Sequence, residues 1–129
     1  MITKLRKRIE SEKGFTLIEM LIVIIILGIL IAIAVPAYLK FRDNANRGAA
    51  QANIRAAIPA MEDYNATNGG YAGMDVADLK LIDPAIKGPP SFDVGATTDT
   101  TYCVEATSGP FTYIKTATTD ITLNAAGCP

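Results

Sequence analysis

A long apolar segment near the N-terminus constrains this chain of 129 residues more than any other feature. Residues 15–35 read FTLIEMLIVIIILGILIAIAV, and only Thr16 and Glu19 among them are polar. As a helix with a rise of ~1.5 Å per residue, the segment would be about 30 Å long, which is roughly the hydrocarbon thickness of a bilayer. The segment therefore predicts a membrane helix, because lipid forces the backbone to satisfy its own hydrogen bonds.

Charged residues are distributed unevenly around this segment. Residues 1–14 contain five basic and two acidic side chains, whereas the rest of the chain contains seven basic and eleven acidic ones. A basic flank beside an apolar segment indicates the cytoplasmic side of a membrane. The acidic remainder argues against direct nucleic-acid binding, because a non-specific grip on phosphates needs clustered Lys and Arg.

A helical pattern continues beyond Pro36 to about residue 68, and it is amphipathic. It predicts a polar stripe, a line of alanines and an apolar ridge on different faces. The stripe consists of Lys40, Asp43, Asn44, Arg47, Gln51, Arg55 and Glu62, the line of Ala45, Ala49, Ala52, Ala56 and Ala60, and the ridge of Ile54, Ile58 and Met61. Gly48 and Pro59 are predicted to bend the helix, and Asn68-Gly69-Gly70 to end it.

The remainder, residues 69–129, holds most of the Gly and Pro and many Thr. Residues 75–82 predict a short helix stopped by Pro84. Residues 100–106 and 111–117 have strand composition around a turn at 108–110, and residues 120–123 predict a third short strand. The expected fold class is α+β, with a long N-terminal α-helix packed against a small antiparallel β-sheet.

The motif Lys-Gly-Phe-Thr-Leu-Ile-Glu occupies residues 13–19, directly before the apolar run. It resembles the class III signal of type IV pilins and of the related pseudopilins. The resemblance implies that a prepilin peptidase cuts between Gly14 and Phe15 and that Phe15 is then N-methylated. Gly14 suits a cut site because it offers no side chain to obstruct the protease. Beyond about the first 50 residues the resemblance is one of layout only.

This resemblance suggests four regions. Residues 1–14 are a leader, residues 15–36 a hydrophobic helix for the membrane or the filament core, residues 37–68 the amphipathic half of that helix, and residues 69–129 a small β-rich region with a disulfide loop. Because the cut precedes the apolar segment, that segment stays with the product, unlike the core of an ordinary secretory signal.

Glu19 is a carboxylate inside an apolar segment, which makes it a functional-site hypothesis by default. The resemblance implies that Glu19 of one subunit pairs with the Phe15 amine of another during assembly. Thr16 would contribute by bonding a carboxylate or a backbone carbonyl. The alternative is that Glu19 simply lies at the level of the lipid headgroups.

Gly28 and Pro36 both weaken a helix, the first by its flexibility and the second by removing a hydrogen bond. The resemblance implies that the stretch between them loosens and extends when the filament is under load. The alternative is that a membrane helix tolerates both residues without consequence.

Cys103 and Cys128 are the two cysteines of a chain without histidine, which argues against a zinc site. On the far side of a membrane such a pair favours a disulfide. The resemblance implies a C-terminal disulfide loop on the filament surface. Free thiols in a non-oxidising compartment are the alternative.

Three weaker signals are present. Asn65-Ala66-Thr67 fits a glycosylation sequon. Tyr64, Tyr71, Tyr102 and Tyr113 would form an aromatic path for electrons or ligands, or more simply pack in and around the core. Asp93, Asp99 and Asp120 are candidate calcium ligands, but their spacing matches no ligand loop, so no metal site is predicted.

The interpretation that accounts for most of these features is the major subunit of a type IV pilus-like filament. Its partners would be other copies of itself in a helical filament, the prepilin peptidase, the assembly machinery and, before assembly, the inner membrane. The filament would then lie outside the cell. Adhesion, twitching motility, DNA uptake and secretion all stay open as roles.

Two alternatives remain. One is a pseudopilin of a type II secretion or DNA-uptake system. The other is a membrane-anchored extracellular binding module, for which Ala32-Ile33-Ala34 resembles a signal-peptidase site. An enzyme is not predicted, because the chain offers no histidine and no activated Ser or Cys constellation. We expect no catalytic residues and no cofactor.

Overall fold

The computed structural model describes residues 14–129, so all of the predicted leader except Gly14 lies outside the described residues. The chain divides into two compact units, Met1–Leu39 and Lys40–Pro129. Helix α2 (Leu17–Asn68) contributes its apolar part to the first unit and its amphipathic part to the second. Each unit is described by itself.

The described part of the first unit is the apolar part of α2. The large apolar side chains between Phe15 and Val35 are each between 42% and 85% exposed. The helix is long and apolar enough to cross a membrane by length and composition. It begins at Leu17 rather than at Phe15, because Thr16 takes the capping position before it. Within the described part of this unit, these side chains therefore have no packing partner.

The amphipathic part of α2 buries a stripe with helical spacing, formed by Ala50, Ile54, Ala57 and Met61. Ala60 is buried as well, but the predicted alanine line is otherwise exposed; its exposed members are Ala45, Ala49, Ala52 and Ala56. The predicted apolar ridge agrees better with the buried face, since two of its three members are buried. The sheet selects the face with the larger side chains, which gain more from burial than alanines do.

Helix α2 ends where the Asn-Gly-Gly sequence predicts. Gly69 has a left-handed φ of 75°, and its N–H donates to the Asn65 carbonyl over 2.8 Å. Helix α3 (Val76–Ile82) follows and matches the predicted short helix. Asp75 caps it by accepting from the Asp78 N–H, and the Asp78 side chain accepts in turn from the Asp75 N–H.

The sheet has four antiparallel strands in the order β1-β2-β3-β4. They are β1 (Asp93–Thr97), β2 (Tyr102–Ser108), β3 (Phe111–Thr116) and β4 (Thr122–Leu123). The predictions for β2, β3 and β4 are confirmed within a few residues. Strand β1 was not predicted. Its sequence, Asp-Val-Gly-Ala-Thr, has little strand character, and its pairing with β2 is irregular between Val94 and Thr97.

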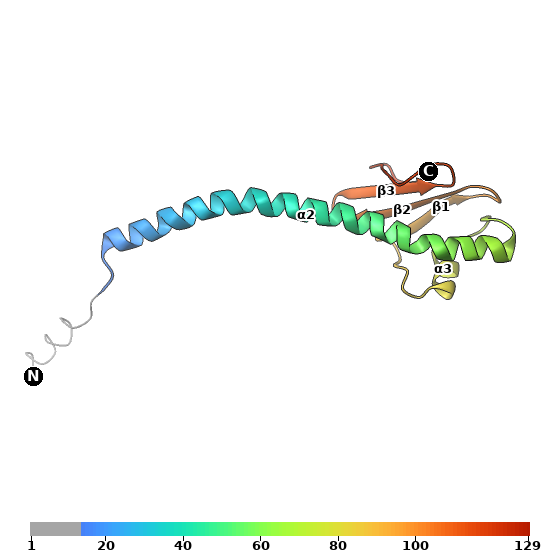
Figure 1. The fold of residues 1–129 in the computed structure, drawn as a ribbon, viewed down its shortest axis with the longest axis horizontal. Helices are drawn as coiled ribbons and strands as arrows, with labels where there is room; N and C mark the ends of the chain where they lie inside the picture. The colour runs from blue at the N-terminus through green and yellow to red at the C-terminus, as the bar shows by residue number, and fades with distance from the viewer. Residues whose placement is uncertain (1–13) are drawn as a thin grey trace, which may run out of the picture. The chain divides into compact units, whose positions relative to one another are not determined.

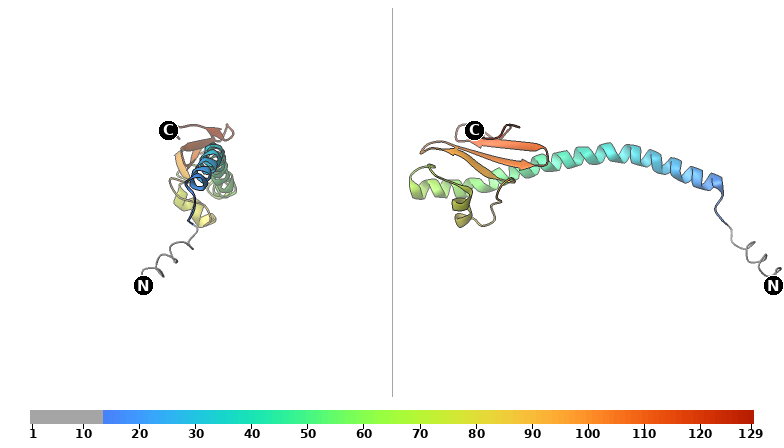
Figure 2. Two further views of the ribbon diagram at one scale, coloured as in Figure 1. Left: turned by 90° about the vertical axis from the view of Figure 1, so that its left-hand side faces the viewer. Right: turned by 180° about the vertical axis from the view of Figure 1, so that it is seen from behind.

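The core of the second unit lies between α2, α3 and the sheet. Its fully buried larger side chains are Ile54, Met61, Leu79, Phe92 and Val104. The sheet and α3 lie on different sides of the amphipathic part of α2 (Figures 1 and 2). The turn between β2 and β3 is fixed to α2 by a 3.2 Å hydrogen bond from the Ser108 hydroxyl to Asn46 Oδ1 and by the Arg47 guanidinium, 4.0 Å from the centre of the Phe111 ring.

Candidate functional site

The first turn of α2 is closed by reciprocal hydrogen bonds between Thr16 and Glu19. Oε2 of Glu19 accepts from the Thr16 backbone N–H over 2.8 Å and from the Thr16 hydroxyl over 2.9 Å. The Glu19 N–H donates to the Thr16 hydroxyl oxygen over 3.2 Å. This is a capping box, which satisfies N–H groups that the first turn of a helix otherwise leaves unpaired. The Thr-x-x-Glu spacing before an apolar run is its sequence signal, although only a general bonding role was predicted for Thr16.

Only one of the two Glu19 carboxylate oxygens takes part in this cap. Within residues 14–129, no hydrogen bond reaches Oε1. Gly14 precedes the helix and is exposed, and the Phe15 side chain is 81% exposed. The structure thus places Gly14, Phe15, Thr16 and Glu19 within the first turn and the residues that lead into it. A carboxylate fixed in orientation there presents one free acceptor.

Gly28 and Pro36 both lie within α2, which runs through them without interruption. A Cβ at Gly28 would meet no atom within 4 Å beyond the helix's own backbone, so packing inside the described chain does not require glycine there. Nothing in this arrangement tests the predicted flexibility of the stretch between them, which stays a prediction.

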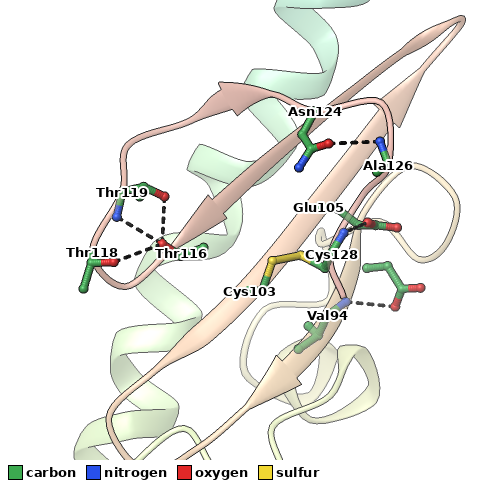
Figure 3. The surroundings of a disulfide bond; sticks show 10 residues. Val94, Cys103, Glu105, Thr116, Thr118, Thr119, Asn124, Ala126 and Cys128 are labelled. Carbon is green, nitrogen blue, oxygen red and sulfur yellow. Dashed lines mark hydrogen bonds between the residues drawn. A yellow bond between two sulfur atoms is a disulfide. The ribbon is translucent and has the colours of Figure 1, made fainter.

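Cys103 and Cys128 form a disulfide, as predicted, with their Cα atoms 5.8 Å apart. In β2, Tyr102, Val104 and Ala106 belong to the core, so the alternating Cys103 and Glu105 lie on the opposite face of the sheet. The bond therefore fixes the end of the chain to the face of the sheet away from α2 (Figure 3).

Two residues that the sequence analysis did not single out help to hold the chain end in place. The Glu105 carboxylate accepts from the backbone N–H of Cys128 over 2.6 Å (Figure 3). Gly95 of β1 lies directly beneath the disulfide, and a Cβ there would be 2.5 Å from the Cys128 Cβ. No sequence signal marks Glu105, because an acid at an outward strand position is ordinary. The isolated glycine in a strand is a sign of a close backbone approach.

Replacing Gly95 with alanine should destabilise the second unit. The added methyl group overlaps the Cys128 side chain, so β1 or the chain end must shift, at a cost of about 1–3 kcal/mol. Urea unfolding of the detergent-solubilised full chain, followed by tyrosine fluorescence, measures the change. The neighbouring Ala96→Ser is the matched control, since Ala96 is exposed. Equal midpoints for G95A and the unmodified chain would contradict the steric role.

The tyrosines mainly serve packing. Tyr71 and Tyr102 are buried and meet edge to face with ring centroids 4.8 Å apart. Burial, together with the nearby Glu62 carboxylate, raises the pKa of Tyr71, so its hydroxyl stays protonated and donates to Glu62 over 3.0 Å. Tyr113 is buried too, and Tyr64 packs against the same core. These contacts favour the packing interpretation over an aromatic path.

The remaining weak signals gain no support. Asn65-Ala66-Thr67 lies inside α2. Asp93 and Asp120 each accept a hydrogen bond from the next backbone N–H in the chain. Across residues 14–129, no group of three acidic, His or Cys side chains is arranged to hold a metal ion.

The sequence is similar to a known family motif and to several known proteins. Residues 11–35 match the prokaryotic N-terminal methylation motif. The chain is 37% identical to the type IV narrow pilus major component PilA5 of Thermus thermophilus, over 87% of this chain and 97% of that protein. It is 34% identical to the type IV wide pilus major component PilA4 of the same organism, over 86% of this chain and 85% of that protein. It is also 40% identical to the type II secretion system core protein G of Pseudomonas aeruginosa, over 48% of this chain and 44% of that protein.

Proposed function

Because this chain belongs to the type IV pilin family, we propose that it is the major subunit of a type IV pilus-like filament, assembled through its apolar helix after removal of a leader. The observation that carries this proposal is the exposure of the apolar part of α2. Its large side chains lack partners within the described residues, and a helix that is apolar on all sides needs lipid or other helices around it. Membrane and filament core provide these two environments in turn.

Leader cleavage between Gly14 and Phe15 supplies the charge that assembly needs. Before the cut, the Phe15 nitrogen is a neutral peptide amide, whereas afterwards it is an amine that carries a positive charge. The family's methylation motif covers this position, so we also assign N-methylation to Phe15. The prepilin peptidase is the partner that this step requires.

The new amine on Phe15 has a natural acceptor in Glu19 of a neighbouring copy. Oε2 of Glu19 is already engaged by its own Thr16, which fixes the direction of the carboxylate, and Oε1 is left to accept from the neighbour. A charge buried among apolar helices without its partner costs several kcal/mol, so this pairing would set the register between copies. Thr16 acts here as a positioning residue.

Polar pairing matters because lipid is nearly as apolar as a bundle of helices. Burial of Ile and Leu side chains alone gives little preference for the filament over the bilayer. The Phe15–Glu19 pair contributes a preference that lipid cannot match. The work of extraction comes from assembly machinery on the cytoplasmic side, where the basic leader lies. The subunit would thus begin in the inner membrane and end in an extracellular filament.

A pseudopilin of a type II secretion system is the second candidate. It is favoured by the similarity to core protein G, which is confined to 48% of this chain. The two pilus components match over 86% or more of this chain, including the region that carries the sheet. This wider match makes the pilus the better proposal. Either filament is a structural assembly, so we assign no catalytic role.

The proposal is tested by examining the chain from its native cells. We expect mass spectrometry of the purified protein to find Phe15 as a methylated N-terminus. Immunogold electron microscopy should find the chain along the whole length of surface filaments. A mature chain that begins at Met1 or Val35, or label restricted to the cell body or to filament tips, would refute the assignment as a major filament subunit.

A further inference from the structure

The C-terminal end of α3 carries an apolar side chain that no other element of the described chain covers. Leu81 is 85% exposed, and the adjacent Ile82 is 39% exposed, although Leu79 on the same helix is fully buried. We infer that this end of α3 docks on the exposed face of α2 between Phe41 and Arg55 of a second copy; the inference rests on the filament proposed above. Both surfaces belong to the second unit, so each is complete within it.

Charge is segregated between the two surfaces. Residues 62–83, which include α3, contain five acidic side chains and one basic one. Residues 40–55 of α2 contain four basic side chains and one acidic one. Lys40, Arg42 and Arg55 are exposed, as are Glu62 and Asp63. Helix α3 with its capping residues carries three acidic side chains, Asp75, Asp78 and Asp83, and one basic one, Lys80, whereas Lys40 and Arg55 are exposed on α2. The acidic excess on α3 is therefore complementary in charge to α2 of another copy, which favours encounter and fixes orientation.

The face of α2 that would receive α3 is formed mainly by small apolar side chains. Phe41 is 73% exposed at its start, and Ala45, Ala49 and Ala52 follow it along the exposed side of the helix. The small side chains let a bulkier group from another chain approach the helix closely. In an aqueous surrounding, covering Leu81 and Phe41 would remove apolar area from water at ~25 cal/mol per Å2.

The two complementary surfaces are different patches of the same chain. A contact between different patches is heterologous, so it leaves one unused copy of each surface at the ends of any oligomer and permits open growth. A contact between identical patches would instead close as a dimer. This contact would therefore join the second units of neighbouring copies, in addition to the Glu19 pairing in the first unit.

Cysteine cross-linking in assembled filaments tests the contact. The full-length variant L81C/A49C is treated with a short bismaleimide, which reacts with free thiols and leaves the Cys103–Cys128 disulfide intact. We expect denaturing gels to show a ladder of pilin multimers, because each copy would be linked to the next. The matched control is L81C/N44C, since Asn44 is also exposed but, by helical spacing, projects from another side of α2. Adding Arg55→Glu to L81C/A49C should lower the yield of multimers several-fold.

The outcomes separate this contact from the filament itself. Filaments seen by electron microscopy without a ladder, or with an equal ladder from the Asn44 control, would overturn the contact while the proposed function stands. Linkage of the thiol introduced by L81C to a different envelope protein would also overturn it, because the occupant would not be a second copy. If the unmodified chain forms no filaments, the proposed function fails first, and the inference fails with it.

Discussion

Filaments should be lost when Glu19 is replaced by leucine, although the leader should still be removed. In the proposed pathway the cut needs Gly14, which the substitution leaves unchanged. Assembly would have to bury the Phe15 amine without its carboxylate, at a cost of about 3–5 kcal/mol, which corresponds to roughly a hundredfold or more in the subunit equilibrium. Mass spectrometry of the mature N-terminus and electron microscopy of sheared filaments measure the two effects separately.

Thr16→Ala and Ile18→Leu are the controls for this experiment. Thr16→Ala removes the cap on α2 and leaves Glu19 charged, so it should cost only the ~0.5–2 kcal/mol of a lost helix cap and reduce filament yield less than Glu19→Leu. Ile18→Leu keeps the apolar surface and should assemble normally. Normal filaments from the Glu19→Leu variant would refute the intersubunit pairing, whereas uncleaved precursor would point to a role of Glu19 in processing.

Replacing both cysteines with serine should weaken the second unit more than the Gly95→Ala change does. The disulfide closes a loop of 24 intervening residues, and in the chain-entropy model a loop of this size contributes about 3–4 kcal/mol. The urea midpoint of the detergent-solubilised full chain should fall accordingly. The end of the chain should also become more accessible to proteases, because hydrogen bonds to Glu105 and Thr112 would then hold it without a covalent link.

Two comparisons define what the bond itself contributes. Treatment of the unmodified chain with a reducing agent should reproduce the midpoint of the double serine variant, since both remove the same cross-link. Glu105→Gln keeps the disulfide and should have a smaller effect, of the order of the ~1 kcal/mol that one hydrogen bond contributes. An unchanged midpoint for the double serine variant would contradict a stabilising role for the bond.

The elements that the sequence could predict are those with a strong local signal. The apolar run predicted the first part of α2, the Asn-Gly-Gly sequence its end, and the alternation around Ser108-Gly109-Pro110 the hairpin of β2 and β3. The motif around Gly14 and Glu19 was visible for the same reason, because each residue type there has an unusual position relative to the apolar segment.

The features that the sequence could not predict depend on contacts between distant segments. Strand β1 contains a glycine and little apolar alternation. It forms because β2 offers hydrogen bonds to it, and its glycine leaves room for the end of the chain. The buried face of α2 was ambiguous, since alanines occur on several sides of it and only the sheet determines which side is covered. The Glu105 contact to Cys128 joins residues 23 apart in sequence, and no local sequence pattern predicts it.

The placement of the chain end affects whether copies of this protein can pair through the edges of their sheets. A β-sheet exposes unpaired backbone groups along its outer strands, and such edges invite strand addition and aggregation. Here one outer strand, β4, is only two residues long, and the other, β1, is irregular and adjoins the disulfide-bound chain end. Neither edge offers a long regular template to a neighbour. Crowded copies would therefore associate through their helices and side chains rather than by adding strands to one another's sheets.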